Sequence, residues 1–196
     1  MSSTVPILIV GPSGVGKSTI IERIALMFPQ VERFKTTTTR EPRHAGDNRY
    51  HFVARTEFEQ MINRGEFLEW TETHGNLYGT EQKVLIDILD QGRYPLPSNA
   101  IDIKGVEAYK KAFPGLLAIF IAYDSLEQLP ERIRRTRPET TEDEIARRMT
   151  TAKEEMAAAN HFDHIVFNHE GKIDQALTEI ATIIADTLQL QPSHKL

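Results

Sequence analysis

Residues 11–18 read Gly-Pro-Ser-Gly-Val-Gly-Lys-Ser and fit the phosphate-loop pattern G-x-x-x-x-G-K-[ST]. An apolar run, VPILIV at residues 5–10, precedes them, and apolar side chains recur at helical spacing over residues 20–28. In a strand, glycine-rich loop and helix in this order, backbone N–H groups and the positive helix N-terminus converge on an anion. Lys17 would reach the β- and γ-phosphates, and the Ser18 hydroxyl would be a Mg²⁺ ligand. The stretch therefore predicts a site for a nucleoside triphosphate.

The rest of the chain alternates apolar runs with helical patterns. Buried strands are predicted at residues 100–103, 116–123 and 164–167, and residues 93–99, which contain two prolines, are interpreted as loop or sheet edge. Helices are predicted at residues 80–92 and 173–184, and capping-box spacing predicts helix starts at Thr56 and Thr141. This alternation is typical of an α/β fold, in which helices cover both faces of a parallel sheet.

Length and composition limit the class of protein. The 196 residues, 40% hydrophobic and 26% charged, are enough for one globular domain and argue against a disordered chain. A net charge of −5 gives no global attraction for nucleic acid, and the absence of cysteine excludes disulfides, thiol nucleophiles and thiolate metal sites. No apolar stretch reaches the ~20 residues that a membrane span needs. We expect a cytoplasmic protein, a monomer or small homo-oligomer, without nucleic-acid or membrane partners.

A second anion site is predicted downstream of the phosphate loop. Arg40, Arg43 and Tyr50 lie in a proline-interrupted stretch where a helix is not expected. Arginine offers a planar fork that matches phosphate oxygens, and tyrosine donates one neutral hydrogen bond. Such a loop can hold a second phosphate, although two solvated surface arginines would be the better interpretation if this segment stood alone.

The segments EFLEWTE (residues 66–72) and GNLYGT (residues 75–80) complete a larger pattern, with which the chain resembles guanylate kinases over residues 5–188. The resemblance implies a P-loop NTPase-type sheet core with a small GMP-binding region and a lid, and ATP and Mg²⁺ as co-substrate and metal. It also implies that Glu69 reads the guanine edge. The other residues that it implicates are Thr36, Thr80 and Asp102 beside the guanine; Arg40, Arg43, Tyr50 and Tyr78 at the GMP phosphate; Gly11, Pro12, Ser13, Gly14, Val15, Gly16, Lys17, Ser18 and Thr19 around the ATP phosphates; and Asn168 near the adenine.

The chemistry of guanine supports this role for Glu69. Guanine presents adjacent N1–H and N2–H₂ donors, so an ionised carboxylate can accept from both. Adenine presents a lone pair at N1, which the carboxylate would repel. Glu69 is therefore expected to select the base, whereas Glu66 and Glu72 are interpreted as exposed acids.

Residues 131–138 read ERIRRTRP, with four arginines within six positions. The resemblance makes this segment the lid that closes over ATP, and the catalytic cations that it implies are Lys17, Arg132, Arg135, Arg137 and Arg148. The family usually has R-G-R-G where this chain has R-T-R-P, so the assignment of roles among the arginines stays open. For Arg134 and Arg147, a solvated helix face is the alternative. Cations are needed because each pair of unit charges on the two substrates repels by about 4 kcal/mol at 4 Å and an effective dielectric of 20.

The chain departs from the family pattern at residues 100–105. The family usually carries D-I-D-x-Q-G, and this chain reads AIDIKG. Ala100 thus removes one carboxylate, which would weaken the organisation of Mg²⁺-bound water, and Lys104 adds a positive charge. The histidines are scattered, so no zinc site is expected.

The leading hypothesis is a phosphotransferase that converts ATP and GMP, or dGMP, to ADP and GDP. Its single domain would comprise a core (residues 1–34, 96–129 and 149–190), a GMP-binding region (residues 35–95) and a lid (residues 130–148). A binding or scaffold domain that has lost catalysis is one alternative, which Ala100 and Lys104 favour and Lys17 and Ser18 oppose. A kinase for another phosphorylated acceptor, such as a sugar phosphate, is the second, and the guanine-directed Glu69 opposes it.

Overall fold

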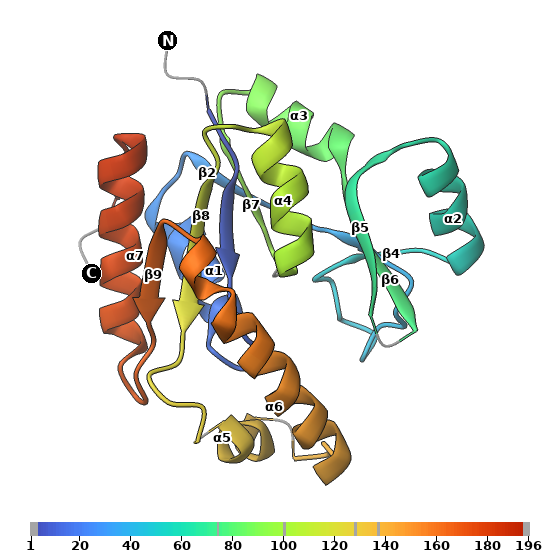
Figure 1. The fold of residues 1–196 in the computed structure, drawn as a ribbon. Coiled ribbons are helices and arrows are strands. Elements are labelled where there is room, and N and C mark those ends of the chain that lie inside the picture. Colours follow the sequence, from blue (N-terminus) through green and yellow to red (C-terminus); the bar gives the residue numbers. More distant parts are fainter. Residues whose placement is uncertain (1–3, 74, 100, 128, 137, 194–196) are drawn as a thin grey trace.

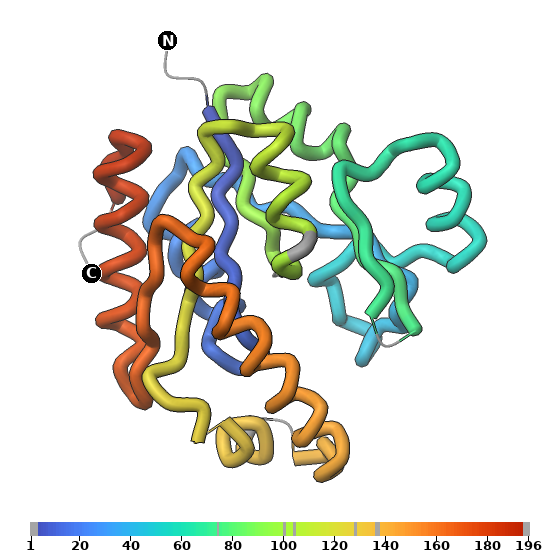
Figure 2. Tube along the Cα trace, in the orientation of Figure 1, coloured from blue at the N-terminus to red at the C-terminus, as the bar shows by residue number. Residues whose placement is uncertain are grey.

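The computed structural model describes residues 4–73, 75–99, 101–127, 129–136 and 138–193. Figures 1 and 2 show a sheet core, a smaller lobe beside it and a helical projection below it. The strands are β1 (Ile7–Val10), β2 (Val31–Phe34), β3 (Thr37–Thr38), β4 (His51–Phe52), β5 (Phe67–Thr73), β6 (Asn76–Glu81), β7 (Tyr94–Pro97), β8 (Leu117–Ala122) and β9 (His164–Phe167). The α-helices are α1 (Lys17–Met27), α2 (Arg55–Asn63), α3 (Gln82–Asp90), α4 (Ile103–Ala112), α5 (Leu129–Thr136), α6 (Glu142–Ala157) and α7 (Ile173–Leu188), and a 3₁₀ turn, η1 (Ala159–His161), follows α6.

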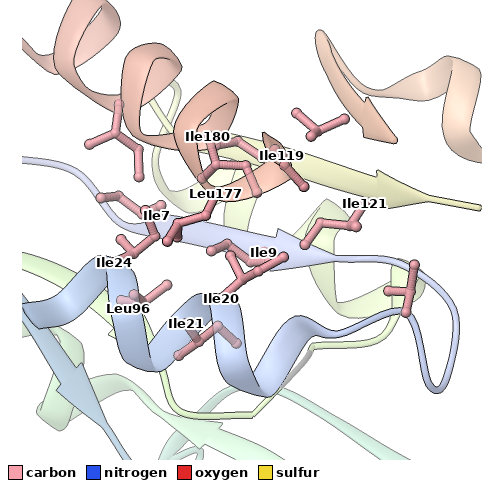
Figure 3. Close-up of a cluster of buried hydrophobic side chains, with 14 of the residues drawn as sticks. Ile7, Ile9, Ile20, Ile21, Ile24, Leu96, Ile119, Ile121, Leu177 and Ile180 are labelled. Carbon is pink, nitrogen blue, oxygen red and sulfur yellow. The ribbon is translucent and has the colours of Figure 1, made fainter. Parts of the chain in front are cut away.

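The core contains a parallel three-stranded sheet in the order β1-β8-β9 and a parallel pair, β2-β7, that lies next to it. Alternate residues of β1 enter two different hydrophobic clusters. Ile7 and Ile9 pack with α1 and α7, whereas Leu8 and Val10 pack with α3 and α4. Figure 3 shows the first cluster, in which α1 and α7 meet over β1. Because both faces of β1 are covered, its whole sequence is apolar. The predicted α/β fold is confirmed.

The proline-rich stretch at residues 93–99 forms β7, whose four residues are all buried. Tyr94 and Ser98 donate their backbone N–H groups toward the β2 side, to Gln30 O at 2.9 Å and Phe34 O at 2.8 Å. Since strand residues alternate, the positions that face β1 are Pro95 and Pro97, which have no N–H to donate. This explains why β7 is adjacent to β1 while no ladder between them is found in the described ranges.

Two local sequence predictions are wrong. Residues 101–103 do not form a strand: Asp102 is the N-cap of α4 and accepts a hydrogen bond from Gly105 N at 2.9 Å. A carboxylate that can accept from the backbone N–H three residues later favours the start of a helix over an extended strand. Ala100, the first residue of the predicted strand, lies outside the described residues. Thr56 does not cap α2, because the helix already begins at Arg55 with Ala54 as its N-cap. The predicted cap at Thr141 is correct, since its side chain accepts from Glu144 N at 3.3 Å.

The smaller lobe is a four-stranded mixed sheet in the order β4-β3-β6-β5. β3 and β4 run parallel, and β6 is antiparallel to both β3 and β5. Helix α2 covers this sheet, and Phe58 and Met61 from the helix pack on Phe67 and Leu77. This lobe lies at the right of Figure 2, and α5 with the first half of α6 forms the projection at the bottom. None of the helices in the described ranges is long and apolar enough to cross a membrane.

Candidate active site

The phosphate loop connects β1 to α1 and is wedged against β8. Gly11 has φ 137°, and a Cβ at this position would lie 2.2 Å from Ile121 O, so only glycine fits there. The Lys17 ammonium donates hydrogen bonds to the carbonyls of Gly11, at 2.5 Å, and Pro12, at 2.7 Å. The side chain of Tyr123, which follows β8, donates to Ser13 O at 2.9 Å. These contacts hold the loop in a curve around the Lys17 side chain.

A central cavity of about 450 Å³ joins this loop to the smaller lobe. The loop side contributes Lys17 and Ser18, and the smaller lobe contributes Arg40 and Arg43. The full lining is Ser13, Gly14, Gly16, Lys17, Ser18, Thr19, Arg40, Arg43, Arg49, Tyr50, Tyr78 and Asn99. The structure therefore brings both predicted anion sites to one cavity. The number of residues between the two anion sites in the sequence does not say how close they lie in space.

A second cavity, of about 220 Å³, neighbours the first, because Tyr50 and Tyr78 line both. Its polar residues are Thr36, Tyr50, Glu69, Thr71, Thr73, Tyr78 and Asp102, and Gly79 and Ile101 complete it. The Tyr50 and Tyr78 rings meet edge to face with centroids 5.8 Å apart. The guanidinium of Arg40 lies 5.3 Å from the centre of the Tyr50 ring. Tyr50 thus lies at the boundary between the carboxylates of one cavity and the cations of the other.

The Glu69 carboxylate is held by a chain of hydroxyl groups. Thr80 donates to Glu69 Oε1 at 2.7 Å, and the buried Tyr109 hydroxyl donates to Thr80 Oγ1 at 3.1 Å. On the other side, a Cβ on Gly105 would lie 2.9 Å from Glu69 Oε2. The absence of a side chain at Gly105 therefore lets the first turn of α4 approach the carboxylate. Strand β5 and helix α4 together set its orientation.

The pKa of Glu69 is raised from its usual 4.5 to about 7, mainly by burial and to a smaller extent by the neighbouring Asp102 carboxylate, while the hydrogen bonds from Thr80 act in the opposite direction. Near neutral pH the group is balanced between its neutral and charged forms. Desolvation of the charged Glu69 carboxylate is the largest cause of this shift in its pKa.

The Glu69→Gln variant should be more stable than the wild type at pH 8. A carboxyl whose pKa is raised in the folded state destabilises the fold as pH rises from about 4.5 to about 7, and the full cost applies above pH 7. Glutamine removes that cost, so we expect its free energy of unfolding at pH 8 to exceed the wild-type value by about 1–3 kcal/mol, with little difference at pH 4.5.

Urea unfolding at the two pH values measures this difference. Glu179→Gln, an exposed substitution on α7, is the matched control and should show no such pH-dependent gain. An equal difference between Glu69→Gln and wild type at pH 4.5 and pH 8 would contradict the origin in a desolvated charge.

The predicted lid cations are partly in ion pairs. Arg132 and Arg135 on α5 both bind Glu170 in the β9–α7 loop, the second at 2.8 Å. These three residues line a third cavity, of about 240 Å³, with Gly14, Asn168, His169, Gly171 and Ile173. Arg134 pairs with Glu142 at 2.7 Å and Arg147 with Glu144 at 2.9 Å, and the side chains of both arginines are more than half exposed. Arg137 lies outside the described residues.

Arg148 on α6 reaches the phosphate loop. Its Nη1 donates to Ser13 Oγ at 3.0 Å, and its Nη2 pairs with Glu144 at 2.8 Å. Its Nε is buried and has no hydrogen-bond partner among the residues that the structure describes. Asn168 also contacts the loop, because its buried side chain donates to Val15 O at 2.7 Å. Arg148 and Asn168 therefore both contact the phosphate loop, and Asn168 also lines the third cavity.

Several site residues were not predicted from the sequence: Asp47, Arg49, Asn99, Tyr109 and Glu170. Asp47 and Glu170 are isolated acids in polar segments, and Tyr109 is one apolar position on a helix, so no local pattern distinguishes them. Arg49 directly precedes Tyr50 and extends the cationic pattern of Arg40 and Arg43, which was the one available signal.

Known proteins resemble this chain in sequence and in fold. Residues 3–187 match the family model described as guanylate kinase. The chain is 38% identical over 177 residues to "Guanylate kinase" of Nostoc sp., covering 89% of this chain and 87% of that protein. It is 36% identical over 192 residues to "Guanylate kinase" of Aromatoleum aromaticum, covering 96% and 92%. The crystal structure of guanylate kinase from Anaplasma phagocytophilum superposes with a TM-score of 0.69 at 25% identity, covering 97% of this chain and 91% of that one.

Proposed function

Because this chain belongs to the guanylate kinase family, we propose that it transfers the γ-phosphoryl group of ATP to GMP or dGMP, giving ADP and GDP or dGDP. The observation that supports this most directly is that two neighbouring cavities share Tyr50 and Tyr78 in their linings. One contains Lys17 together with Arg40 and Arg43, and the other contains Glu69. A nucleotide that spans both would place its phosphate beside the phosphate loop while its base meets the carboxylate.

The acceptor site is proposed to read the base and the phosphate separately. The Glu69 carboxylate, with one oxygen bound to Thr80, would accept from guanine N1–H and N2–H₂. Thr36 and Asp102 line the same cavity beside it. Arg40, Arg43, Tyr50 and Tyr78 would hold the phosphate in the cavity that also contains Lys17. None of these assignments involves the 2′ position of the sugar, which is why dGMP is included as an acceptor.

The donor site is proposed at the phosphate loop and the third cavity. Residues 11–19 would surround the ATP phosphates, and backbone N–H groups of the loop, except at Pro12, which has none, would donate to them. The adenosine would occupy the cavity lined by Asn168, whose buried Oδ1 has no hydrogen-bond partner within the described ranges and could accept from the adenine amino group. We assign the lid to residues 130–148, the acceptor region to residues 35–95 and the core to the rest of residues 1–190.

The residues present also fit Mg²⁺. Ser18 lines the central cavity beside Lys17, and Mg²⁺ in such sites is bound by few protein oxygens, several waters and substrate phosphates. The Ser18 hydroxyl would hold the ion, which when bound supplies charge neutralisation at the β- and γ-phosphates. The carboxylate that the family usually has at position 100 is absent from this chain, because Ala100 stands there.

The protein's part in the reaction is positioning and charge compensation. Phosphoryl transfer asks little covalent chemistry of the protein. A GMP phosphate oxygen is already an anion, so it can attack the γ-phosphorus in line without a general base. Lys17, Arg148 and the α5 arginines would offset the repulsion between the two nucleotides, which is about 4 kcal/mol per pair of unit charges at 4 Å and an effective dielectric of 20. Closure of the lid would exclude water and so limit hydrolysis of ATP.

The direct test is an assay of purified protein with Mg-ATP and each of GMP, dGMP, AMP and ribose 5-phosphate. Formation of GDP and dGDP, with little turnover of the other two acceptors, supports the proposal. The absence of GDP formation above a protein-free blank over a range of pH and Mg²⁺ concentrations would refute it.

The Glu170→Gln variant should have a lower KM for ATP. Arg132 and Arg135 are bound to Glu170, and a γ-phosphate must compete with that carboxylate for them. Both ion pairs are partly exposed to solvent and therefore weak, so we expect a decrease of about two- to fivefold in the KM for ATP. Glu142→Gln, which releases Arg134 instead, is the matched control, and steady-state kinetics with varied ATP measures both. A KM for ATP that rises in Glu170→Gln would show that Glu170 assists donor binding.

A further inference from the structure

The carboxylate of Asp47 is a shared anchor for the loop between β3 and β4. The side chain is completely inaccessible to solvent. It accepts from Arg40 Nη2 at 2.9 Å, from Arg49 Nε at 3.0 Å and from the backbone N–H of Arg43 at 3.2 Å. One buried acid therefore contacts both arginines predicted for the acceptor phosphate and a third arginine that was not predicted.

The arrangement brings positive charge to the central cavity in a defined geometry. Lys17, Arg40, Arg43 and Arg49 all line that cavity. The Arg49 and Arg40 guanidinium groups hold the pKa of Asp47 well below its usual range, so this carboxylate is a permanent anion. A fixed anion behind several cations offsets their mutual repulsion and restricts the rotamers of Arg40 and Arg49.

Arg49 is held from a second side. Asn99, which follows β7 and lines the same cavity, donates its side-chain N–H to Arg49 O at 2.7 Å. The Arg49 guanidinium presents Nε and Nη2 to Asp47, and the guanidinium fork has further N–H donors on Nη1 and Nη2. With its side chain 45% exposed, Arg49 is accessible to a ligand in the cavity.

We propose that Arg49 is a further arginine of the acceptor-phosphate site and that Asp47 is the positioning residue for Arg49 and Arg40. The inference rests on the proposed function, because it takes the ligand of this cavity to be the phosphate of a nucleoside monophosphate. The alternative role for this cluster is purely structural: Asp47 and Arg49 would then stabilise the loop without contacting substrate.

Binding of GMP and of guanosine, measured by calorimetry, separates these roles. Charge-assisted hydrogen bonds to a phosphate correspond to about a 10- to 100-fold effect on affinity. We expect Arg49→Ala to weaken GMP binding by that factor and to leave guanosine binding within twofold of wild type. Arg49→Lys should recover part of the loss. Arg33→Ala, which removes an exposed arginine on β2, is the matched control and should bind both ligands as the wild type does.

Asp47→Asn tests the positioning role. It should raise the KM for GMP about tenfold, because asparagine removes the negative charge and one of the two acceptor oxygens that hold the guanidinium groups, and the KM for ATP should stay unchanged. A merely structural role predicts equal losses for GMP and guanosine in Arg49→Ala and changes in both KM values in Asp47→Asn, and either result overturns the inference. So does unchanged GMP affinity in Arg49→Ala. If the wild type phosphorylates GMP while Arg49→Ala keeps full GMP affinity, only this inference fails; if the wild type binds neither ligand, the proposed function fails with it.

Discussion

The Lys17→Met variant should lose about 10³-fold or more of its kcat/KM for GMP. Lys17 is the cation at the centre of the phosphate loop and lines the cavity that also contains Arg40 and Arg43. In that position its ammonium would meet the charge that develops on the transferring group, and methionine keeps the length of the side chain while removing that charge. The effect should appear mainly in kcat, because it concerns the transition state more than ground-state binding of GMP.

A coupled assay of ADP formation at saturating Mg-ATP measures this loss. Lys17 also donates to the carbonyls of Gly11 and Pro12, so a thermal melt must show that the variant is folded. Lys83→Ala, which removes a lysine 83% exposed on α3, is the control and should retain full activity. A folded Lys17→Met protein with more than a tenth of wild-type kcat would contradict the assignment of this loop to the ATP phosphates.

The Glu69→Gln variant should lose about 10²- to 10³-fold of kcat/KM for GMP, mostly through KM. The carboxylate is expected to accept two hydrogen bonds from guanine, and a glutamine amide can accept one while its NH₂ group opposes the other donor. The KM for ATP should change little, because Glu69 lines the smaller cavity and is absent from the lining of the central and third cavities. Glu72→Gln, on the same strand but outside the cavity lining, is the matched control.

The pH dependence gives a second, independent measure of the same residue. Because burial raises the pKa of Glu69 to about 7, the free wild-type enzyme should bind GMP progressively less well as pH falls below 7, by up to tenfold per pH unit. The phosphate of GMP also titrates near pH 6, but it does so equally with wild type and Glu69→Gln. The ratio of their KM values should therefore shrink between pH 8 and pH 5, and a constant ratio would show that Glu69 does not read the base in its ionised form.

Local sequence signals were enough for the framework of the fold. The phosphate loop, the apolar strand before it and the cap at Thr141 depend on residues within a few positions of one another, and the structure contains each of them. The sequence was misleading at residues 100–103, where an apolar strand pattern competes with a helix-capping aspartate. Residues 100–103 look like a strand, yet Asp102 starts α4. The mixed sheet of the smaller lobe was not predicted, since its short strands β3 and β4 have two residues each and no detectable period.

The sequence by itself determined that this chain has an α/β core with a phosphate loop. Its resemblance to guanylate kinases, a family membership that the comparisons confirm, supplied the residues that we propose for both nucleotide sites. Only the tertiary structure decided their electrostatic state. Glu69 has a raised pKa because β5, β6 and α4 surround it, Asp47 is an anchor because the loop buries it, and the α5 arginines meet Glu170 from 35 and 38 residues away. The physical reason is that desolvation and Coulomb energies depend on distance and burial in space, which residue order alone does not specify.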